Sequence, residues 1–376
     1  MARLKILALN AGSSSLKASL FELSAPGREG DPPMGQLWEA ESEDGNESLE
    51  QLLGGVVQAD VIGHRVVHGG ASLVDSVLVT AAVRAEIARV AEYAPAHNAA
   101  ALRLMDAATR VFGEHVPQVA VFDTAFHQTM PPAAFTYAGP YAWLAQGIRR
   151  YGFHGISHQY ASHRAARLLD RAQGDLRVVS CHLGSGCSLA AVRGGQSVDT
   201  TMGFTPLDGI PMARRSGAVD PGILIHLLRH GGETVDSLDR MLNHDSGLAG
   251  LSGTSGDMRH VLAAASAGDD RSQLAFDVFV HRTCQGIASM AASMGGVDTI
   301  VFTGGVGEHA PRVRAEICAS LGFLGVSLDP GRNATCHSDG DISDQLSPTR
   351  VLVVRAQENW MVARECVRIA RVAPGN

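Results

Sequence analysis

The chain has 376 residues, of which 45% are hydrophobic and 18% are charged. That length is enough for two domains with substantial cores, and a net charge of −7 excludes the basic surface that nucleic-acid-binding proteins need. No apolar run approaches the roughly 20 residues of a membrane span, and the N-terminal apolar run is interrupted at Asn10, unlike a signal peptide. The six cysteines include no C-x-x-C pair, as is typical of a reducing compartment. We therefore expect a cytoplasmic protein with no nucleic-acid or membrane partner.

The first predicted element is a β-hairpin with a polar tip. Residues 4–9 and 16–21 are short apolar strands, and the string "NAGSSSLK" around the turn supplies small hydrogen-bonding residues and one cation, Lys17. Such a tip can present N–H groups, hydroxyls and the lysine to an anion, although the segment taken alone favours an ordinary hairpin turn. It is not a Walker A loop, because G-x-x-x-x-G-K-[ST] is absent and no helix is expected to follow.

The remaining elements alternate between strands and helices. Up to Asp123 we expect a loop-rich segment over 24–50 with a short strand at 36–40, a strand over 61–67, helical residues 80–113 broken at Pro95, and a buried strand. After residue 150 the pattern restarts, with three strands and two turns over 176–200. His182 opens the first of these turns 172 positions after Asn10 (182 − 10), which indicates a duplicated domain.

The last third of the chain continues the α/β pattern. We expect a helix that ends at Gly295-Gly296, a strand over 297–303 followed by a glycine turn "GGVGEH", a helix over 310–322, and a final strand and helix over 350–372. Two α/β halves with polar turns at the ends of their strands predict a ligand cleft between the halves.

Several polar groups in these turns suit phosphoryl chemistry. The turns "NAGSSSLK", "HLGSGCS" and "TGGVGEH" each follow an apolar strand and fit contacts to a nucleotide. Arg65 and Arg215 lie in glycine-rich surroundings, where a planar guanidinium can bind carboxylate and phosphoryl oxygens. Asp123 and Glu358 lie near strand ends, a common place for Mg²⁺ ligands. The alternatives are surface ion pairs for the arginines, and helix capping or salt bridges for the acids.

The histidines have a simpler interpretation. His154 follows a Gly-Phe pair and would by default be a core residue. The pairs His64 with His68 and His154 with His158 have a spacing that zinc sites use, but they have no neighbouring acidic or Cys ligands and do not read as H-E-x-x-H helices. The serines that follow Gly12 lack the G-x-S-x-G context of a nucleophile.

Taken together, these strings closely resemble the acetate kinase family of the acetate and sugar kinase/heat-shock/actin superfamily. The resemblance runs almost end to end and is carried by "NAGSSSLK", "HRVVHGG", "FDTAFHQTMP", "YGFHGISHQY", "HLGSG", "SVDTTMGFTPLDGIPMARRSG", "FTGGVGE" and "ENWMVARE". It implies an α/β fold of duplicated RNase H-like (actin-like ATPase) domains with an interdomain active-site cleft. The implied domains are residues 1–124, with a C-terminal helix over 360–376 packing back on them, and residues 125–359.

The resemblance also implies a reaction and the residues that serve it. The reaction is reversible, Mg²⁺-dependent (Mn²⁺ able to substitute) in-line transfer of a phosphoryl group from ATP to acetate, giving acetyl phosphate and ADP, in a homodimer. The catalytic residues would be Asp123, His154, Arg215 and Arg65, with His154 and Arg215 stabilising the transition state, and the metal residues would be Asn10 and Glu358. Substrate would contact Arg65, Val67, Ala96, Phe153 and Pro206. ATP would contact Lys17, His182, Gly184, Ser185, Gly186, Asp257, Met258, Arg259, Gly305, Val306, Gly307, Glu308 and His309.

Several positions depart from the family pattern. Ser185 and His309 stand where the family usually has Asn, and Met258 where Phe is common, all on the expected nucleotide side. Ala96 replaces the usual Leu of the acyl pocket, and Asn359 replaces a second acid beside Glu358. These differences leave open a propionate or other short-chain acyl kinase. A non-catalytic nucleotide-binding module and an RNase H-like hydrolase are rivals from other classes, the latter without the dense acidic cluster it would need.

Overall fold

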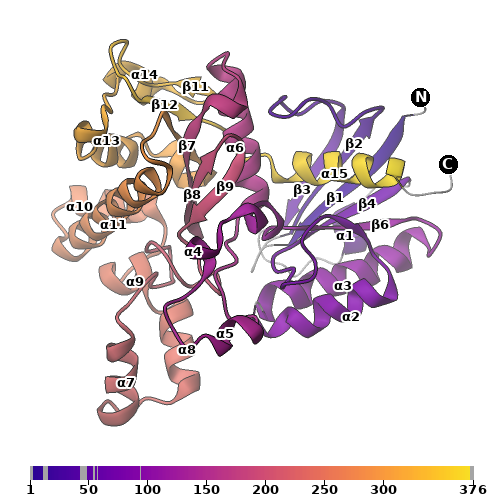
Figure 1. The fold of residues 1–376 in the computed structure, drawn as a ribbon, viewed down its shortest axis with the longest axis horizontal. Helices are drawn as coiled ribbons and strands as arrows, with labels where there is room; N and C mark the ends of the chain where they lie inside the picture. The colour runs from indigo at the N-terminus through magenta and orange to yellow at the C-terminus, as the bar shows by residue number, and fades with distance from the viewer. Residues whose placement is uncertain are drawn as a thin grey trace. The chain divides into compact units, whose positions relative to one another are not determined.

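The computed structural model describes residues 3–11, 16–42, 49–53, 56, 58–93 and 95–372. The chain divides into two compact units, whose segments Figure 1 traces by colour. Unit 1 is Met1–Gln128, Pro140–Arg164 and Gln357–Asn376, and unit 2 is Thr129–Gly139 and Ala165–Ala356. Residues 140–164 and Glu358, which we expected in the second domain, therefore fall in unit 1.

Unit 1 is built on a six-stranded mixed sheet in the order β3-β2-β1-β4-β6-β5. Strands β1, β2 and β3 are antiparallel neighbours, β4 and β6 continue parallel to β1, and short β5 closes the edge antiparallel to β6. The strands are β1 (Leu4–Ala11), β2 (Leu16–Leu23), β3 (Gln36–Ser42), β4 (Val61–Val66), β5 (Val77–Leu78) and β6 (Gln118–Phe122). The predicted hairpin and the three strands expected after it, β3, β4 and β6, are confirmed, but the tip residues 12–15 lie outside the described residues.

Helices cover both faces of this sheet because its strands bury alternate residues on each side. Leu7 and Leu9 of β1 pack in a core with Ala107 and Ala108 of α3, whereas α15, yellow in Figure 1, packs on β1 and β4. Gly63 makes that approach possible, since a Cβ there would lie 2.5 Å from side-chain atoms of α15. The helices of unit 1 are α1 (Leu49–Leu53), α2 (Ala81–Arg89), α3 (Pro95–Phe112), α5 (Ala142–Ala145) and α15 (Glu358–Val372), with 3₁₀ turns at Val90–Tyr93 and Ala125–Thr129.

Unit 2 repeats the same strand order with different residues. Its sheet runs β11-β12-β10-β7-β8-β9, so three antiparallel strands again lead into two parallel ones, with a short antiparallel edge strand added. The strands are β7 (Arg177–Leu183), β8 (Cys187–Arg193), β9 (Gln196–Thr200), β10 (Thr299–Thr303), β11 (Gly340–Asp341) and β12 (Arg350–Val353). The two sheets confirm the predicted α/β fold of duplicated halves.

The long helix α11 (Asp270–Met294) packs on β7, β8 and β9. It begins after Asp269, whose side chain accepts a hydrogen bond from the Ser272 N–H, and ends at Gly295 in a left-handed conformation, as predicted. The other helices of unit 2 are α4 (Pro132–Phe135), α7 (Pro221–His230), α8 (Val235–His244), α9 (Gly247–Ser252), α10 (Met258–Ser266), α12 (Gly304–His309), α13 (Pro311–Ala319) and α14 (Pro330–Thr335), with 3₁₀ turns at Gln173–Asp175 and Gly322–Leu324; α6 (Gly155–Leu168) begins in unit 1 and ends in unit 2.

One element prediction is wrong. The string "GGVGEH", expected as a glycine turn, forms helix α12. Glycine is required at its first position, because Gly304 has a φ of 77° and a Cβ would lie 2.8 Å from the Leu183 carbonyl oxygen. The buried Arg314 guanidinium donates to the carbonyls of Gly307 and Glu308, which holds the helix in place despite its glycines.

Candidate active site

Four of the predicted site residues meet on one face of the unit 1 sheet. Leu9 of β1 pairs in register with His64 of β4, and both point to the α3 side, so the next residues, Asn10 and Arg65, point to the face that α15 covers. Helix α15 begins there with Glu358, whose Oε2 accepts a hydrogen bond from Asn10 Nδ2 at 2.7 Å. Two residues that are 348 positions apart in the sequence (358 − 10) therefore meet within unit 1.

Asp123 completes this cluster from the end of β6. Arg65 binds it with two parallel hydrogen bonds, from Nε to Oδ1 at 3.1 Å and from Nη2 to Oδ2 at 2.5 Å. The remaining guanidinium nitrogen, Nη1, donates to Asn10 Oδ1 at 3.1 Å, and Nε lies 3.9 Å from Glu358 Oε2. Arginine and its three oxygen-bearing neighbours form one connected network, which we call the acid–arginine cluster (Asn10, Arg65, Asp123 and Glu358).

Burial sets the electrostatics of the cluster. Asp123 is wholly buried and Arg65 is 10% exposed. Loss of hydration raises the pKa of Asp123 to about 6, with Arg65 opposing that rise and Glu358 adding to it. Burial disfavours the charge on Arg65, but the attraction of Asp123 and Glu358 outweighs it and raises the arginine pKa above its usual value. Both groups are therefore charged near neutral pH, with Asp123 the more sensitive to acid.

His154 lies beside Asp123 in a strained backbone conformation. Its φ is 54°, in the left-handed region that residues with side chains seldom adopt. Its backbone N–H donates to the Asp123 carboxylate, and Gly155 N–H donates to the Asp123 carbonyl at 3.0 Å. Only glycine fits at 155, since a Cβ would lie 2.0 Å from that carbonyl oxygen. Two hydrogen bonds therefore hold the backbone of His154 and Gly155 against Asp123. They fix the position of the backbone atoms to which the His154 imidazole is attached.

The acyl-pocket residues predicted in unit 1 are only partly described. Val67 and Phe153 are buried, and the Phe153 ring lies 5.4 Å from the ring of His68, centre to centre. The side chain of Ala96 lies outside what the structure describes. Lys17, predicted to bind nucleotide phosphate, stands opposite Asn10 in the β1–β2 pair and forms an ion pair with Glu41 at 3.0 Å.

The other predicted arginine belongs to unit 2 and differs from Arg65 in its partners. Arg215 Nη1 donates to the carbonyl of Pro206 at 3.1 Å, which brings a predicted catalytic residue next to a predicted substrate residue. Burial lowers the pKa of Arg215. Among the described residues no carboxylate forms an ion pair with it. A half-buried guanidinium of this kind can take an anionic ligand without first breaking a salt bridge.

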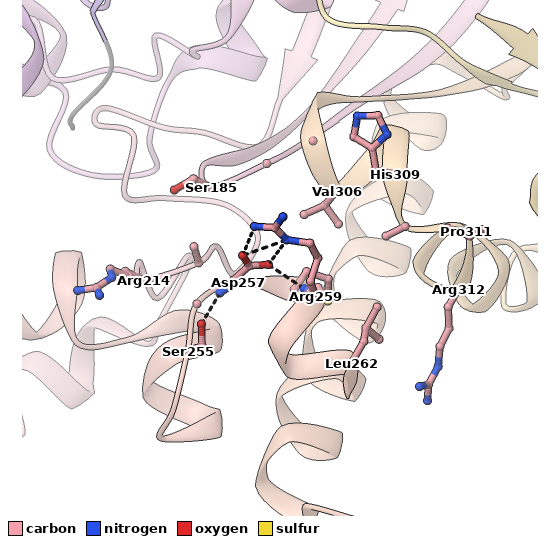
Figure 2. A pocket seen from close by; sticks show the side chains of 16 residues that line it. Ser185, Arg214, Ser255, Asp257, Arg259, Leu262, Val306, His309, Pro311 and Arg312 are labelled. Atoms are coloured by element: carbon pink, nitrogen blue, oxygen red, sulfur yellow. Dashed lines mark hydrogen bonds and ion pairs between the residues drawn. The ribbon is translucent and has the colours of Figure 1, made fainter. Parts of the chain in front are cut away.

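A cavity of about 770 Å³ in unit 2 gathers most of the predicted nucleotide residues. Ser185 lines it from the β7–β8 turn, Arg259 from the start of α10, and Val306 and His309 from α12 (Figure 2). Met258, the first residue of α10, also belongs to the lining. His182 lies beside this wall, since a Cβ on Gly184 would be 3.7 Å from His182 Nε2 and 3.9 Å from the Gly305 nitrogen. The predicted residues in its lining are Gly184, Ser185, Asp257, Met258, Arg259, Gly305, Val306 and His309.

An ion pair lies in the wall of the cavity that α10 forms. Arg259 Nη2 lies 2.5 Å from Asp257 Oδ2, and Asp257 also caps α10 by accepting the Arg259 backbone N–H (Figure 2). These hydrogen bonds from Arg259 lower the pKa of Asp257 to about 2. The Arg259 side chain is 88% exposed, so a ligand can displace it at little cost.

Some predicted nucleotide residues have other positions, and some lining residues were missed. Gly186 and Gly307 are not in the lining, and the buried carboxylate of Glu308 instead accepts the N–H groups of Gly304 and Ala356 at 3.0 and 2.8 Å. The lining residues that sequence reasoning did not find are Ala213, Arg214, Ser255, Gly256, Leu262, Ala310, Pro311 and Arg312. Most of them lie next to predicted residues in the sequence, so adjacency to Asp257–Arg259 and to "GGVGEH" was the available signal.

Comparison with known proteins agrees with this arrangement. The model of the acetokinase family matches residues 46–364. The chain belongs to the acetokinase family. This member is 48% identical to the acetate kinase of Gloeobacter violaceus (strain ATCC 29082 / PCC 7421), over 96% of this chain and 98% of the relative, and 49% identical to that of Synechococcus sp. (strain JA-2-3B'a(2-13)) over the same shares.

Two solved structures share the fold over 98% of this acetokinase-family chain and 100% of their own chains. One is Porphyromonas gingivalis acetate kinase, with a TM-score of 0.85 and 34% identity. The other is a propionate kinase from Francisella tularensis subsp. tularensis SCHU S4, with a TM-score of 0.85 and 36% identity. Two kinases named for different acyl substrates therefore resemble this chain almost equally in structure.

Proposed function

We propose that this chain is an acetate kinase, which transfers the γ-phosphoryl group of ATP to acetate and runs reversibly to acetyl phosphate and ADP. Membership of the acetokinase family supports the activity, as do relatives named acetate kinase at 46–49% identity. The observation that carries it is the acid–arginine cluster, in which Arg65, Asp123, Asn10 and Glu358 are linked by hydrogen bonds of 2.5–3.1 Å. A non-catalytic nucleotide-binding module would have no need of such a buried charged network.

In the proposed reaction, the site residues stabilise the charge of the transferring phosphoryl group and do not transfer protons. Acetate has a pKa of about 4–5, so it is already ionised at pH 7 and needs no general base. Two anions must nevertheless approach each other, and positioned cations and donors lower that barrier. Arg215, with no carboxylate partner among the described residues, and the imidazole of His154 are the groups we assign to the transferring phosphoryl. Arg65 holds the acetate side, and Asp123 keeps its guanidinium in place.

The cluster also has the donor set of a magnesium site. Glu358 and Asp123 offer carboxylate oxygens and Asn10 an amide oxygen, and Mg²⁺ prefers oxygen donors, one or two carboxylates and several waters. These residues therefore fit the ion, with Glu358 and Asn10 as the groups that would hold it and Mn²⁺ as a substitute. When bound, the metal would neutralise charge on the phosphates of the nucleotide. Asn10 and Glu358 would orient it, because each fixes the other through the 2.7 Å hydrogen bond.

ATP is the proposed donor and the unit 2 cavity its site. About 770 Å³ lies within the usual range for small-molecule sites. The cavity offers apolar walls from Met258, Leu262 and Val306 for a base, and the Asp257 carboxylate for ribose hydroxyls.

Trapping of the acyl phosphate tests the proposed activity. Purified protein, Mg²⁺ and ATP should convert acetate to acetyl phosphate, which hydroxylamine captures as a coloured hydroxamate. GTP and pyrophosphate in place of ATP, and a panel of carboxylates in place of acetate, define the donor and the acceptor. Absence of hydroxamate with every carboxylate, together with intact folding, would contradict the proposal.

Propionate is the second candidate acceptor. The structural likeness to a propionate kinase at 36% identity and the small residue Ala96 both favour it. One methylene in an apolar pocket is worth roughly 10–200-fold in discrimination. Ala96→Leu should therefore suppress propionate turnover while acetate turnover survives, measured as the ratio of the two kcat/KM values. An unchanged ratio would remove Ala96 from the pocket wall.

We also propose a cytoplasmic homodimer. Among the described residues no helix is long and apolar enough to cross a membrane, and all six cysteines are free thiols. Helix α7 exposes Ile225 and Leu228 at 49% and 44%, an apolar face that a second copy of the chain would cover. Replacing both with Asp should convert a dimer to a monomer in light scattering. A wild-type monomer would contradict the proposal.

A further inference from the structure

We propose that α7 carries a binding site for a divalent transition-metal ion, with the imidazoles of His226 and His230 as its two protein ligands. The two residues are four positions apart on a formed helix, so they lie one above the other on successive turns. Asp220 caps this helix by accepting the Gly222 N–H at 2.8 Å, and Pro221 occupies its first turn. The backbone that aligns the two rings is therefore well defined.

The ring geometry is close to that of two imidazoles on one ion. Their centres are 5.4 Å apart with planes inclined by 51°. Two imidazoles bound to one metal at 2.0–2.1 Å, at a tetrahedral angle, have ring centres about 5 Å apart. A small rotation about the side-chain bonds brings the nitrogens into range, and no backbone change is needed.

Both rings are available. His226 and His230 are exposed, and within the described residues their contact with each other is the one hydrogen-bond, ion-pair or ring interaction that either makes. In the same residues no group of three or more His, Cys, Asp or Glu side chains comes together to hold a metal. Water must therefore fill the remaining coordination positions, so the site is open and exchangeable, with an affinity below that of a closed structural zinc site.

Ligand type separates this site from the proposed magnesium site. Imidazole nitrogen suits Cu²⁺, Ni²⁺ and Zn²⁺, with Cu²⁺ the tightest, whereas Mg²⁺ prefers oxygen. The pair also lies apart from the face of α7 that Ile225 and Leu228 form. At about 100° per residue, the midpoint of His226 and His230 is about 150° around the helix from the midpoint of Ile225 and Leu228. A second copy covering that apolar face would leave the two imidazoles open.

Calorimetric titration of the tag-free full chain with Ni²⁺ tests the proposal. With excess Mg²⁺ present to occupy the proposed magnesium site, the wild type should bind one Ni²⁺ ion per chain, and His226→Gln or His230→Gln should each weaken binding at least tenfold. His244→Gln is the matched control: it removes an exposed histidine of the neighbouring helix whose upstream turn neighbour is Arg240, and it should leave the affinity unchanged. Addition of further Mg²⁺ should not compete.

Several outcomes would overturn the site. They are equal Ni²⁺ affinity in the wild type and the two variants, an equal loss in His244→Gln, or a ratio of one ion to two chains, which would mean a bridge between copies. Circular dichroism of each variant shows that the helix remains. Kinase activity with Mg²⁺ should be the same in His226→Gln and in the wild type, so this proposal and the proposed function fail independently.

Discussion

The acid–arginine cluster of unit 1 and the cavity of unit 2 are built on opposite principles. In the cluster, buried charges satisfy one another: Arg65 is 10% exposed and every one of its guanidinium nitrogens has an oxygen partner. In the cavity, glycines and apolar side chains leave open space, and the Arg259 side chain of the ion pair in its wall is exposed. Removing one partner from a buried network leaves a charge uncompensated, whereas an exposed pair contributes little. Unit 1 should therefore be sensitive to substitution in both stability and turnover, and the unit 2 cavity mainly in binding.

The two predicted arginines give the sharpest form of this comparison. Arg65→Ala and Arg215→Ala should each lower kcat by about 10²–10³-fold or more, since each removes a donor to developing charge. The two variants should differ in their free energy of unfolding. Loss of Arg65 strands the buried Asp123 and should cost about 3–5 kcal/mol of unfolding free energy, whereas loss of Arg215, which has no carboxylate partner among the described residues, should cost less than about 1.5 kcal/mol.

Urea unfolding and steady-state kinetics on the same preparations measure both quantities. Arg65→Lys keeps the charge and serves if the alanine variant does not fold, but it should restore turnover only partly because it lacks the planar fork. Near-normal kcat in either alanine variant would remove that residue from the proposed chemistry. Equal destabilisation by both would contradict the contrast between the units.

Glu358 tests whether the cluster holds the metal. Glu358→Ala should weaken the apparent Mg²⁺ affinity under turnover by at least about 10–100-fold, while Glu358→Gln keeps the hydrogen bond from Asn10 and removes only the charge. A structural role as the first residue of α15 would instead lower the melting temperature in both variants without changing the metal dependence. Titration of activity with Mg²⁺, alongside thermal melts, distinguishes the two roles.

Much of the fold was predictable because its signals are local. The strands over 4–9 and 16–21 and the stop at Gly295 follow from short apolar runs bounded by turn-forming residues and from glycine conformation. The segment "GGVGEH" was wrongly predicted as a turn because its helix depends on partners distant in the sequence, the Arg314 side chain and the Ala356 N–H. Helices α7 to α9 were not predicted at all, since no motif in that segment was singled out.

The site was predictable as a set of residues but not as a geometry. Asn10 and Glu358 were expected to meet across the two halves, yet they meet within unit 1, because α15 packs back on β1 and β4. The strained φ of His154 and the ion pair between Lys17 and Glu41 could not be read from the sequence, since both depend on tertiary contacts. The lining from Ala310 to Arg312 was missed because nothing in those residues is chemically distinctive.

Lowering the pH should also affect the two regions differently, by destabilising unit 1 more than the cavity of unit 2. Burial lowers the pKa of His64 and of His127, both in unit 1, to about 4. Because the folded pKa is depressed below about 6.5, the unfolded chain binds more protons between these values, and stability is lost as the pH falls from about 6.5 to 4. Each histidine should cost about 2 kcal/mol between pH 7 and 5. In the cavity, Asp257, with its pKa lowered to about 2, stays ionised over the same range.

Hydrogen exchange at pH 7 and pH 5 checks this prediction. Protection of peptides from β4 and β6 should fall, while that of α10 should change less. His64→Gln keeps a polar side chain beside Gln118 but cannot titrate, so its pH dependence should be shallower than that of the wild type. Identical pH profiles for the two proteins would rule out His64 as a source of the acid sensitivity.

The smallest expected effect concerns donor selection by the cavity. Ser185 and His309 both line it, and the family pattern described from the sequence predicts Asn at both positions, whose amide donates and accepts hydrogen bonds at once. A hydroxyl can do either but reaches less far, and the His309 side chain is 64% exposed, so it can turn to solvent instead of the ligand.

A single neutral hydrogen bond contributes about 0.5–1.5 kcal/mol net, or about 2–12-fold. Ser185→Asn with His309→Asn should therefore raise the ratio of kcat/KM for ATP over GTP by that factor, without changing kcat for ATP. Arg312→Gln, at the same wall but outside these two positions, is the matched control. An unchanged ratio in the double variant would mean that backbone groups such as the open Gly305 select the donor; a fall in kcat would mean that the cavity also positions the phosphates.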